Sequence, residues 1–396
     1  MRVRESLLAL SLILPTSLAG QSVLGSSGLG LRAEPLDAIQ RALGGAGVVT
    51  RTAVVLPGNP LAALDILAPT IAFTVQPYWG TYTVGLDEGD FSSTRFPVIG
   101  FAYPLGTEGV VTLTAGSQFD QNWSVKTSGS VDIRGQNVGL TDTFLSDGAI
   151  TAIQLGWARR MTTTLALGVS IGVYRGGLTR RFTRAFDQQD PDSVTVTTVG
   201  TPIQPAAIGG RWSHSGPLAS LNLSWDPSPI LQVGAAANWG GKLNVNPETG
   251  SEGFSREVSV PMEFKVAASA AVFPTFTLSA GTTFSNWTDL GEPSIDEAAA
   301  GETISYGAGV EWDRLSFWAG PLPIRVGFRR SDQPFLFLGN EVKESTYSFG
   351  FSVVMAQALD LPLAAVDVAI EAGKRTSGNF EESFRRLTIT TRIGGN

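Results

Sequence analysis

Apolar residues alternate with polar or small residues at a period of two through most of this chain. In FTLSAGTTFSNW (276–287), one face carries Phe276, Leu278, Ala280, Thr282 and Phe284. Because successive side chains of a strand point to opposite sides, the pattern predicts strands that each have one apolar face. The segments that we predict as strands are 71–84, 96–105, 109–123, 149–160, 163–184, 211–226, 230–246, 255–273, 275–288, 303–317, 322–333, 345–355, 365–375 and 384–394.

The start of the chain has the features of an export signal. In MRVRESLLALSLILPTSLAGQS, two arginines precede an apolar run, and Ser17-Leu18-Ala19 supplies small residues at a cleavage site. We therefore predict a signal peptide over residues 1–19. The chain has no Cys, so an exported domain would need a large core or a membrane for its stability. Beyond residue 19 no apolar run reaches the ~18 residues of a membrane helix, which leaves a closed barrel as the membrane-spanning alternative.

Alternation also occurs in soluble sandwiches, and two further features favour a barrel. The first is charge within strands, on the polar face, as at Glu263 and Glu311. The second is loop length, because long polar connections such as GLDEGDFSSTR and 185–210 alternate with tight ones such as DPSP. The segment 356–364 is a longer connection on the short side. This asymmetry is typical of an outer-membrane β-barrel with both termini in the periplasm.

Tryptophans are expected at the two membrane boundaries of such a barrel. Trp157 and Trp225 lie beside predicted periplasmic turns, and Trp123, Trp212 and Trp287 lie near the opposite strand ends. The alternative is that these side chains pack in the core of a soluble protein.

Residues 20–68 precede the first predicted strand, and their stretch RALGGAGVVTRTAVVLPGNPLAAL (41–64) is apolar and rich in Gly and Pro. We predict that 20–68 form a plug in the lumen, and that 69–396 form the barrel. Gly44, Gly45 and Gly47 would permit close packing of the backbone. Asn59 and Pro60 would form a turn, either a simple one or one with a gating role.

These residues resemble a known family. GGAGV (44–48) followed by Asn59-Pro60-Leu61 resembles the amino-terminal hatch of the FadL/TodX long-chain fatty-acid outer-membrane transporters. Trp287 in a strand before a long loop, RVGFR (325–329), and 366–374 followed by Arg385-Arg386 resemble further elements of that family. Three features depart from it: Leu61 in place of Ala, Arg51 in the spacer, and the ending IGGN.

The resemblance implies a fourteen-stranded barrel of the Gram-negative outer membrane, closed by a hatch and without a cofactor. Such a barrel passes hydrophobic molecules, either fatty acids or hydrocarbons, inward and releases them through a gap in its wall. Some relatives instead serve as adaptor barrels for the secretion or assembly of surface proteins, and that alternative stays open. The expected partners are hydrophobic small molecules, outer-membrane lipids and lipopolysaccharide, and the barrel-assembly machinery. The net charge of −7 argues against nucleic acid.

Cationic side chains on the polar strand face could meet the anionic head of a ligand in the lumen. They are Lys265, Arg325, Arg329, Arg386 and Arg392. The alternative, which we favour, is that they pair with acidic residues across the barrel. Those acidic residues are Glu263, Glu311, Asp367 and Glu371.

An enzyme is not predicted. His214 is the only histidine, and its neighbours Ser213 and Ser215 point to the opposite strand face, so they make a poor nucleophile–base pair. With no Cys and no second His, we expect no metal site and no catalytic residues.

Overall fold

The computed structural model describes residues 22–46, 53–84, 87–133, 136–186, 205–251, 253–317, 320–358 and 361–395. The predicted signal peptide, Gly47 and Arg51 lie outside the described residues.

Fourteen antiparallel strands form a closed barrel, in which the last strand pairs with the first. Four of the fourteen are interrupted, so each carries two labels. In order, the wall consists of β2 (Thr70–Val84), β3 (Asp87–Arg95) with β4 (Val98–Pro104), β5 (Val110–Asp120) with β6 (Trp123–Ile133), β7 (Gln136–Arg160), β8 (Leu165–Phe186), β9 (Ala206–Ser228), β10 (Leu231–Trp239) with β11 (Lys242–Pro247), β12 (Arg256–Ser259) with β13 (Glu263–Phe273), β14 (Phe276–Asn286), β15 (Glu302–Trp312), β18 (Ile324–Asp332), β19 (Lys343–Ala358), β20 (Leu361–Ser377) and β21 (Phe380–Gly394). The predicted all-β barrel of fourteen strands is confirmed, and every predicted strand overlaps one of these.

The two faces of the wall are inverted relative to a soluble protein. On β14, Leu278 is 46% exposed and its neighbour Ser279 only 6%. The same alternation runs along β18, where Val326 is exposed and Arg325 is buried. An apolar outer face and a polar inner face are the requirements of a transmembrane barrel. None of the helices in the described residues is long and apolar enough to span a bilayer.

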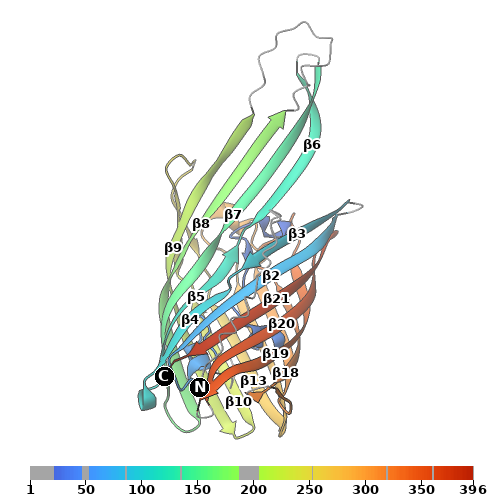
Figure 1. Ribbon diagram of the computed structural model, residues 1–396. Coiled ribbons are helices and arrows are strands. Elements are labelled where there is room, and N and C mark those ends of the chain that lie inside the picture. Colours follow the sequence, from blue (N-terminus) through green and yellow to red (C-terminus); the bar gives the residue numbers. More distant parts are fainter. Residues whose placement is uncertain are drawn as a thin grey trace, which may run out of the picture.

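Strand lengths correct part of the loop prediction. GLDEGDFSSTR, predicted as a loop, mostly forms β3, and β6 and β7 extend the next hairpin well beyond the rim of the barrel (Figure 1). Most residues of β3 and β6 are polar, although Phe91 and Arg95 of β3 are buried. Ladder hydrogen bonds to β2 and β7 satisfy the backbones of these strands. Segment 356–364 also belongs mostly to strands, β19 and β20.

The longer connection on the short side is instead 313–323, which contains the small hairpin of β16 (Ser316–Phe317) and β17 (Gly320–Pro321). The remaining turns on that side are short, including the one that holds the 3₁₀ helix η3 (Gly106–Glu108). On the opposite side, the long connection 287–301 holds α2 (Pro293–Asp296). The predicted asymmetry therefore holds for some of the connections only. The carboxyl end of the described chain lies at the short-turn end of the barrel, where the N–H of Gly395 donates to the carbonyl of Pro69 at 2.8 Å (Figure 1).

Residues 22–46 and 53–69, here called the amino-terminal segment, pack against the inner face of the wall. Their elements are η1 (Val23–Ser26), β1 (Leu31–Arg32), α1 (Ala38–Ala42) and η2 (Pro60–Ala63). Asp37 caps α1, because its carboxylate accepts a hydrogen bond from the backbone N–H of Gln40 at 2.9 Å. α1 contacts strands β18 to β21, whereas η2 contacts β5 and β7 to β9. The segment therefore contacts opposite parts of the wall.

Candidate functional site

Inward-facing glycines of the wall allow the backbone of the amino-terminal segment to lie directly on the sheet. These glycines, here called the glycine seat, are Gly307 and Gly309 of β15, Gly327 of β18 and Gly350 of β19. A Cβ atom at position 309 would lie 2.7 Å from the Cα atom of Leu43, and one at position 307 would overlap the carbonyl oxygen of Gly44. Gly44 itself has φ +69°, a backbone conformation that favours glycine. Residues 42–44 can therefore lie close to the sheet because these facing positions have no Cβ atom.

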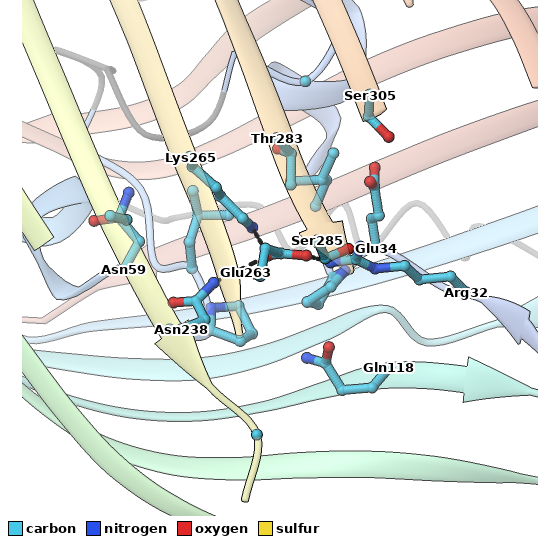
Figure 2. A pocket seen from close by; sticks show the side chains of 18 of the residues that line it. Arg32, Glu34, Asn59, Gln118, Asn238, Glu263, Lys265, Thr283, Ser285 and Ser305 are labelled. Atoms are coloured by element: carbon cyan, nitrogen blue, oxygen red, sulfur yellow. Dashed lines mark hydrogen bonds and ion pairs between the residues drawn. The ribbon is translucent and has the colours of Figure 1, made fainter. Parts of the chain in front are cut away.

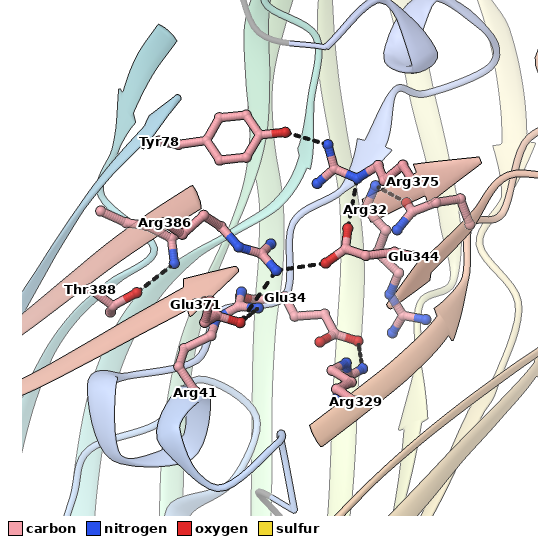
Figure 3. A network of polar contacts seen from close by, with 12 residues as sticks. Arg32, Glu34, Arg41, Tyr78, Arg329, Glu344, Glu371, Arg375, Arg386 and Thr388 are labelled. Carbon is pink, nitrogen blue, oxygen red and sulfur yellow. Dashed lines mark hydrogen bonds and ion pairs between the residues drawn. The ribbon is translucent and has the colours of Figure 1, made fainter. Parts of the chain in front are cut away.

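Buried ion pairs lie between the wall and this segment (Figure 3). Arg375 Nε donates to Glu344 Oε2 at 2.7 Å, and its Nη1 donates to Glu382 Oε1 at 2.7 Å. Arg386 Nη2 donates to the other oxygen of Glu344 at 2.6 Å and to Glu371 at 3.3 Å. All five side chains are at most 7% exposed. We call these five residues the charge network. Its two guanidinium groups and three carboxylates leave one excess negative charge, which Arg41 of the amino-terminal segment balances from beside Glu371.

The amino-terminal segment joins this network. Ser22 donates a hydrogen bond to Glu382, and Arg41 lies 3.9 Å from Glu371. Glu34 pairs with Arg329 of β18. Burial acts to raise the pKa of Glu34, but Arg329 and Arg32 outweigh it, so this pKa lies below its ordinary value. Glu34 is therefore a carboxylate at neutral pH.

A cavity of about 110 Å³ lies between the segment and the wall strands β5, β7 to β10, β13 to β15 and β18. Apolar side chains border part of it: Phe119, Tyr174, Leu218 and Trp287. Charged side chains border another part: Arg32, Glu34, Glu263, Lys265 and Arg329. Figure 2 shows Lys265 and Arg32 reaching Glu263 from two sides, with the Lys265 contact at 2.8 Å. With three cations and two carboxylates, the charged part carries one excess positive charge.

A seam without strand pairing adjoins this cavity. Among the described residues, β3 pairs with β2 only, and the β4–β5 ladder ends at Val98 and Gly116. The free edge of β5 pairs instead with β1, where Arg32 lies opposite Phe119. β3 and β6 then diverge (Figure 1). The seam is bridged by Arg95 of β3 and Asp120 of β5, whose buried side chains approach to 2.6 Å.

The five cations predicted from the sequence take different places. Lys265 and Arg329 border the cavity. The others do not border it and are paired on the wall: Arg325 with Glu311 at 2.6 Å, Arg392 with Asp367 at 2.7 Å, and Arg386 within the charge network. The pairing that the sequence favoured is therefore present for each of the four acidic residues it named. Contact with the head of a ligand stays a prediction.

The predicted hatch residues lie on both sides of the lumen. Gly44 and Gly45 follow α1, and a Cβ atom on Gly45 would meet the guanidinium of Arg329. Asn59 is the N-cap residue of η2 and borders the cavity. Pro60 begins η2 and packs near the wall glycine Gly156. Their gating role stays a prediction.

Two tryptophans differ from the prediction. Trp225 lies on the outer face, as expected for a boundary residue, but Trp287 is buried and Trp212 packs beside it. The indole ring of Trp287 contacts Phe119 and Phe335, and its N–H donates to Ser285 Oγ at 2.9 Å. Both rings therefore pack in the interior of the barrel and not at a membrane boundary.

The sequence reasoning also missed Arg95, Asp120, Glu344, Arg375 and Glu382. The sequence held a signal for two of them. Glu344 lies four residues before Ser348, and Arg375 lies four residues after Glu371, so each pair points to the same face of its strand. Period two therefore places both side chains in the lumen.

Fold and interior together define a class: a transmembrane β-barrel whose lumen is occupied by its own amino-terminal residues. Solved structures of this fold include a FadL homologue of Pseudomonas aeruginosa, with a TM-score of 0.61 at 10% identity, covering 93% of this chain and 100% of that one. The toluene transporter TbuX of Ralstonia pickettii has a TM-score of 0.59 at 14% identity, covering 92% and 99%. TodX, a toluene transporter of P. putida, has a TM-score of 0.58 at 12% identity, covering 92% and 99%.

No protein-family model and no curated protein matches the sequence. The resemblance to the FadL/TodX family is therefore confirmed as a likeness of fold.

Proposed function

We propose that this chain is an outer-membrane channel for the passive uptake of hydrophobic molecules, exported by residues 1–19 and closed by residues 20–68 as a hatch. The observation that carries the proposal is the internal cavity, where aromatic and aliphatic side chains meet an excess of cations. The neighbours described as toluene transporters and as a monoaromatic hydrocarbon channel favour the same class.

The cavity suits an amphiphile better than a sugar or an ion. Burial of each CH₂ group against Phe119 and Trp287 contributes about 0.8 kcal/mol, which draws an alkyl or aryl group out of water. Lys265 and Arg329 offer donors for a carboxylate head, and charge-assisted hydrogen bonds are the strong ones. A ligand with an anionic head would compensate the excess positive charge, so we place fatty acids ahead of plain hydrocarbons.

Filling the cavity should abolish binding without disturbing the wall. Ala267 is buried and borders the cavity, whereas its neighbour Ala268 points outward. We expect Ala267→Phe to weaken ligand binding about five- to hundredfold, because overfilling a packed site typically costs about 1–3 kcal/mol. Ala268→Phe, which places the same ring on the lipid side, should leave binding unchanged.

The measurement is equilibrium binding of labelled oleate and labelled toluene to the purified barrel, after mass spectrometry of small molecules that co-purify with it. Loss of binding in the Ala267 variant alone supports the cavity as the binding site. Equal binding by both variants, or no binding of either probe by the unmodified protein, would overturn the proposal.

We further propose that the ligand leaves through the seam between β3 and β6. Phe119 borders the cavity and lies next to Asp120, so the seam is the part of the wall with a missing ladder that adjoins the cavity. Here the buried Arg95–Asp120 ion pair stands where the rest of the wall has a ladder of backbone hydrogen bonds. A lateral path would release an apolar solute into the bilayer and avoid water.

The absence of Cys makes the seam directly testable. In a variant with Arg95→Cys and Asp120→Cys, a bifunctional thiosulfonate should block uptake of labelled oleate, and a reducing agent should restore it. The control is Ser269→Cys with Ser279→Cys, across the intact ladder of β13 and β14 and away from the residues that line the cavity. Uptake that continues through a cross-linked seam would place the exit elsewhere.

A further inference from the structure

A second depression lies on the outer face of the barrel, away from the lumen. It spans β2, β3, β19, β20 and β21 and has a volume of about 1010 Å³. Its outer rim carries Trp79 and Tyr347, which are 41% and 69% exposed. Between these rings the wall carries the small side chain of Ala372 and, beside Trp79, the side chain of Arg385. We call this depression the outer groove.

Strand register shows that the outer groove lies where the apolar belt ends. Four outward residues are side by side across the wall: Tyr347, Ala372, Arg385 and Trp79. One step toward the chain termini, the corresponding residues are the apolar Phe349, Ile370 and Leu387. One step away from the termini they are the polar Ser345, Lys374 and Ser383. Exposed aromatic rings at such a boundary are typical of the headgroup level of a bilayer.

Cations lie at this boundary beside the apolar floor. Lys374 is 62% exposed and pairs with Glu381 at the surface. Arg385 is exposed and borders the groove, as does one acidic residue, Asp90 of β3. Arg330, also exposed, lies on β18 opposite Ser345. Long cationic side chains at this level can lay their stems on apolar surface and hold their charge among headgroups.

We propose that the outer groove binds one molecule of a phosphorylated glycolipid of the outer leaflet. An acyl chain lies over Ala372 between the rings of Trp79 and Tyr347, and a phosphate binds Arg385 and Lys374. Charge complementarity selects this occupant, because phosphate is the anion that neighbouring Arg and Lys side chains recognise and its lipid places an apolar chain directly below. The proposal rests on the placement of the barrel in an outer membrane with its termini in the periplasm. It does not rest on transport.

The test uses the intact barrel with two probes, lipid A that carries both phosphates and fully dephosphorylated lipid A. Native mass spectrometry counts the glycolipid molecules that the purified protein retains, and titration of delipidated protein gives the affinity. We expect one retained molecule and a preference for the phosphorylated probe. Arg385→Ser with Lys374→Ser should lower the affinity for phosphorylated lipid A at least about tenfold, because hydrogen bonds to charged groups contribute about 1.5–3 kcal/mol.

Two further variants separate the site from general surface charge. Ala372→Trp fills the groove without altering charge and should also lower the affinity. Arg211→Ser removes an exposed cation from β9, far around the wall, and should not. Binding of oleate in the lumen should be unchanged in all of these variants. Retention of no lipid, equal binding of the two probes, an Ala372 variant that binds normally, or a preference for phosphatidylethanolamine would overturn the proposal.

Discussion

Replacing Arg375 with methionine is expected to destabilise the barrel by about 3–5 kcal/mol, the usual cost of removing one partner of a buried ion pair. Arg375 is 2% exposed and pairs with Glu344 and Glu382. Its guanidinium also lies over the ring of Phe384, 4.6 Å from the centroid. Without it, Glu382 keeps hydrogen bonds from Tyr78 and Ser22 but has no cation left at its carboxylate. A buried carboxylate in that position strongly opposes folding.

The measurement is the urea concentration that unfolds the purified barrel, followed by the mobility of the folded form on unheated gels. The matched control is Lys242→Met, which breaks an exposed pair with Glu257 and should cost at most about 1 kcal/mol. Adding Glu344→Gln and Glu382→Gln to the Arg375 variant should recover part of the loss, because it removes the uncompensated charges. Similar midpoints for the Arg375 and Lys242 variants would show that the charge network contributes little to stability.

Replacing Gly309 with valine is expected to displace the amino-terminal segment while the wall still forms. A Cβ atom there would meet backbone atoms of Leu43 at 2.7 to 2.8 Å, and backbone cannot move aside as a flexible side chain can. The added methyl groups leave no position for residues 42–44 on the sheet. β-branched residues are otherwise well suited to strands, so the ladders to β14 and β18 should persist.

Two measurements report the displacement. Limited proteolysis should cleave the segment of the Gly309 variant faster than that of the unmodified protein, and planar-bilayer recordings should show a higher conductance. Ala308→Val is the matched control, because Ala308 is the adjacent outward-facing residue of the same strand. If the Gly309 variant is as resistant and as closed as the control, the glycine seat is not what holds the segment in place.

The sequence predicted where the strands lie and which side chains point outward, because alternation at a period of two is a property of each strand by itself. The inverted exposure of Leu278 and Ser279 follows directly from the alternation in FTLSAGTTFSNW once a membrane surrounds the barrel. β3 was not predictable in the same way. Its residues DEGDFSSTR have no apolar face, and only the ladder to β2 makes them a strand. Where a hairpin extends into water, its strands have the polar composition of a loop, and the sequence alone therefore predicts a loop there.

The candidate site was also predictable only in part. Period two places Lys265, Arg325 and Arg329 in the lumen, but which of them borders the cavity depends on where the amino-terminal segment lies. Trp287 has the position of a boundary residue in the sequence, yet its ring turns inward to Phe119, which is more than one hundred and fifty residues away in the chain.

By itself the sequence determined the barrel, its number of strands and the polarity of its two faces, because each follows from alternation within a strand and from the requirement that no backbone group remain unpaired in lipid. Only the tertiary structure decided the seam and the glycine seat. Both arise from pairings between residues far apart in the chain: β1 occupies the edge of β5 that would otherwise continue the wall, and Gly44 meets Gly307 only after the barrel has closed. Such contacts depend on register across several strands, which no local pattern encodes.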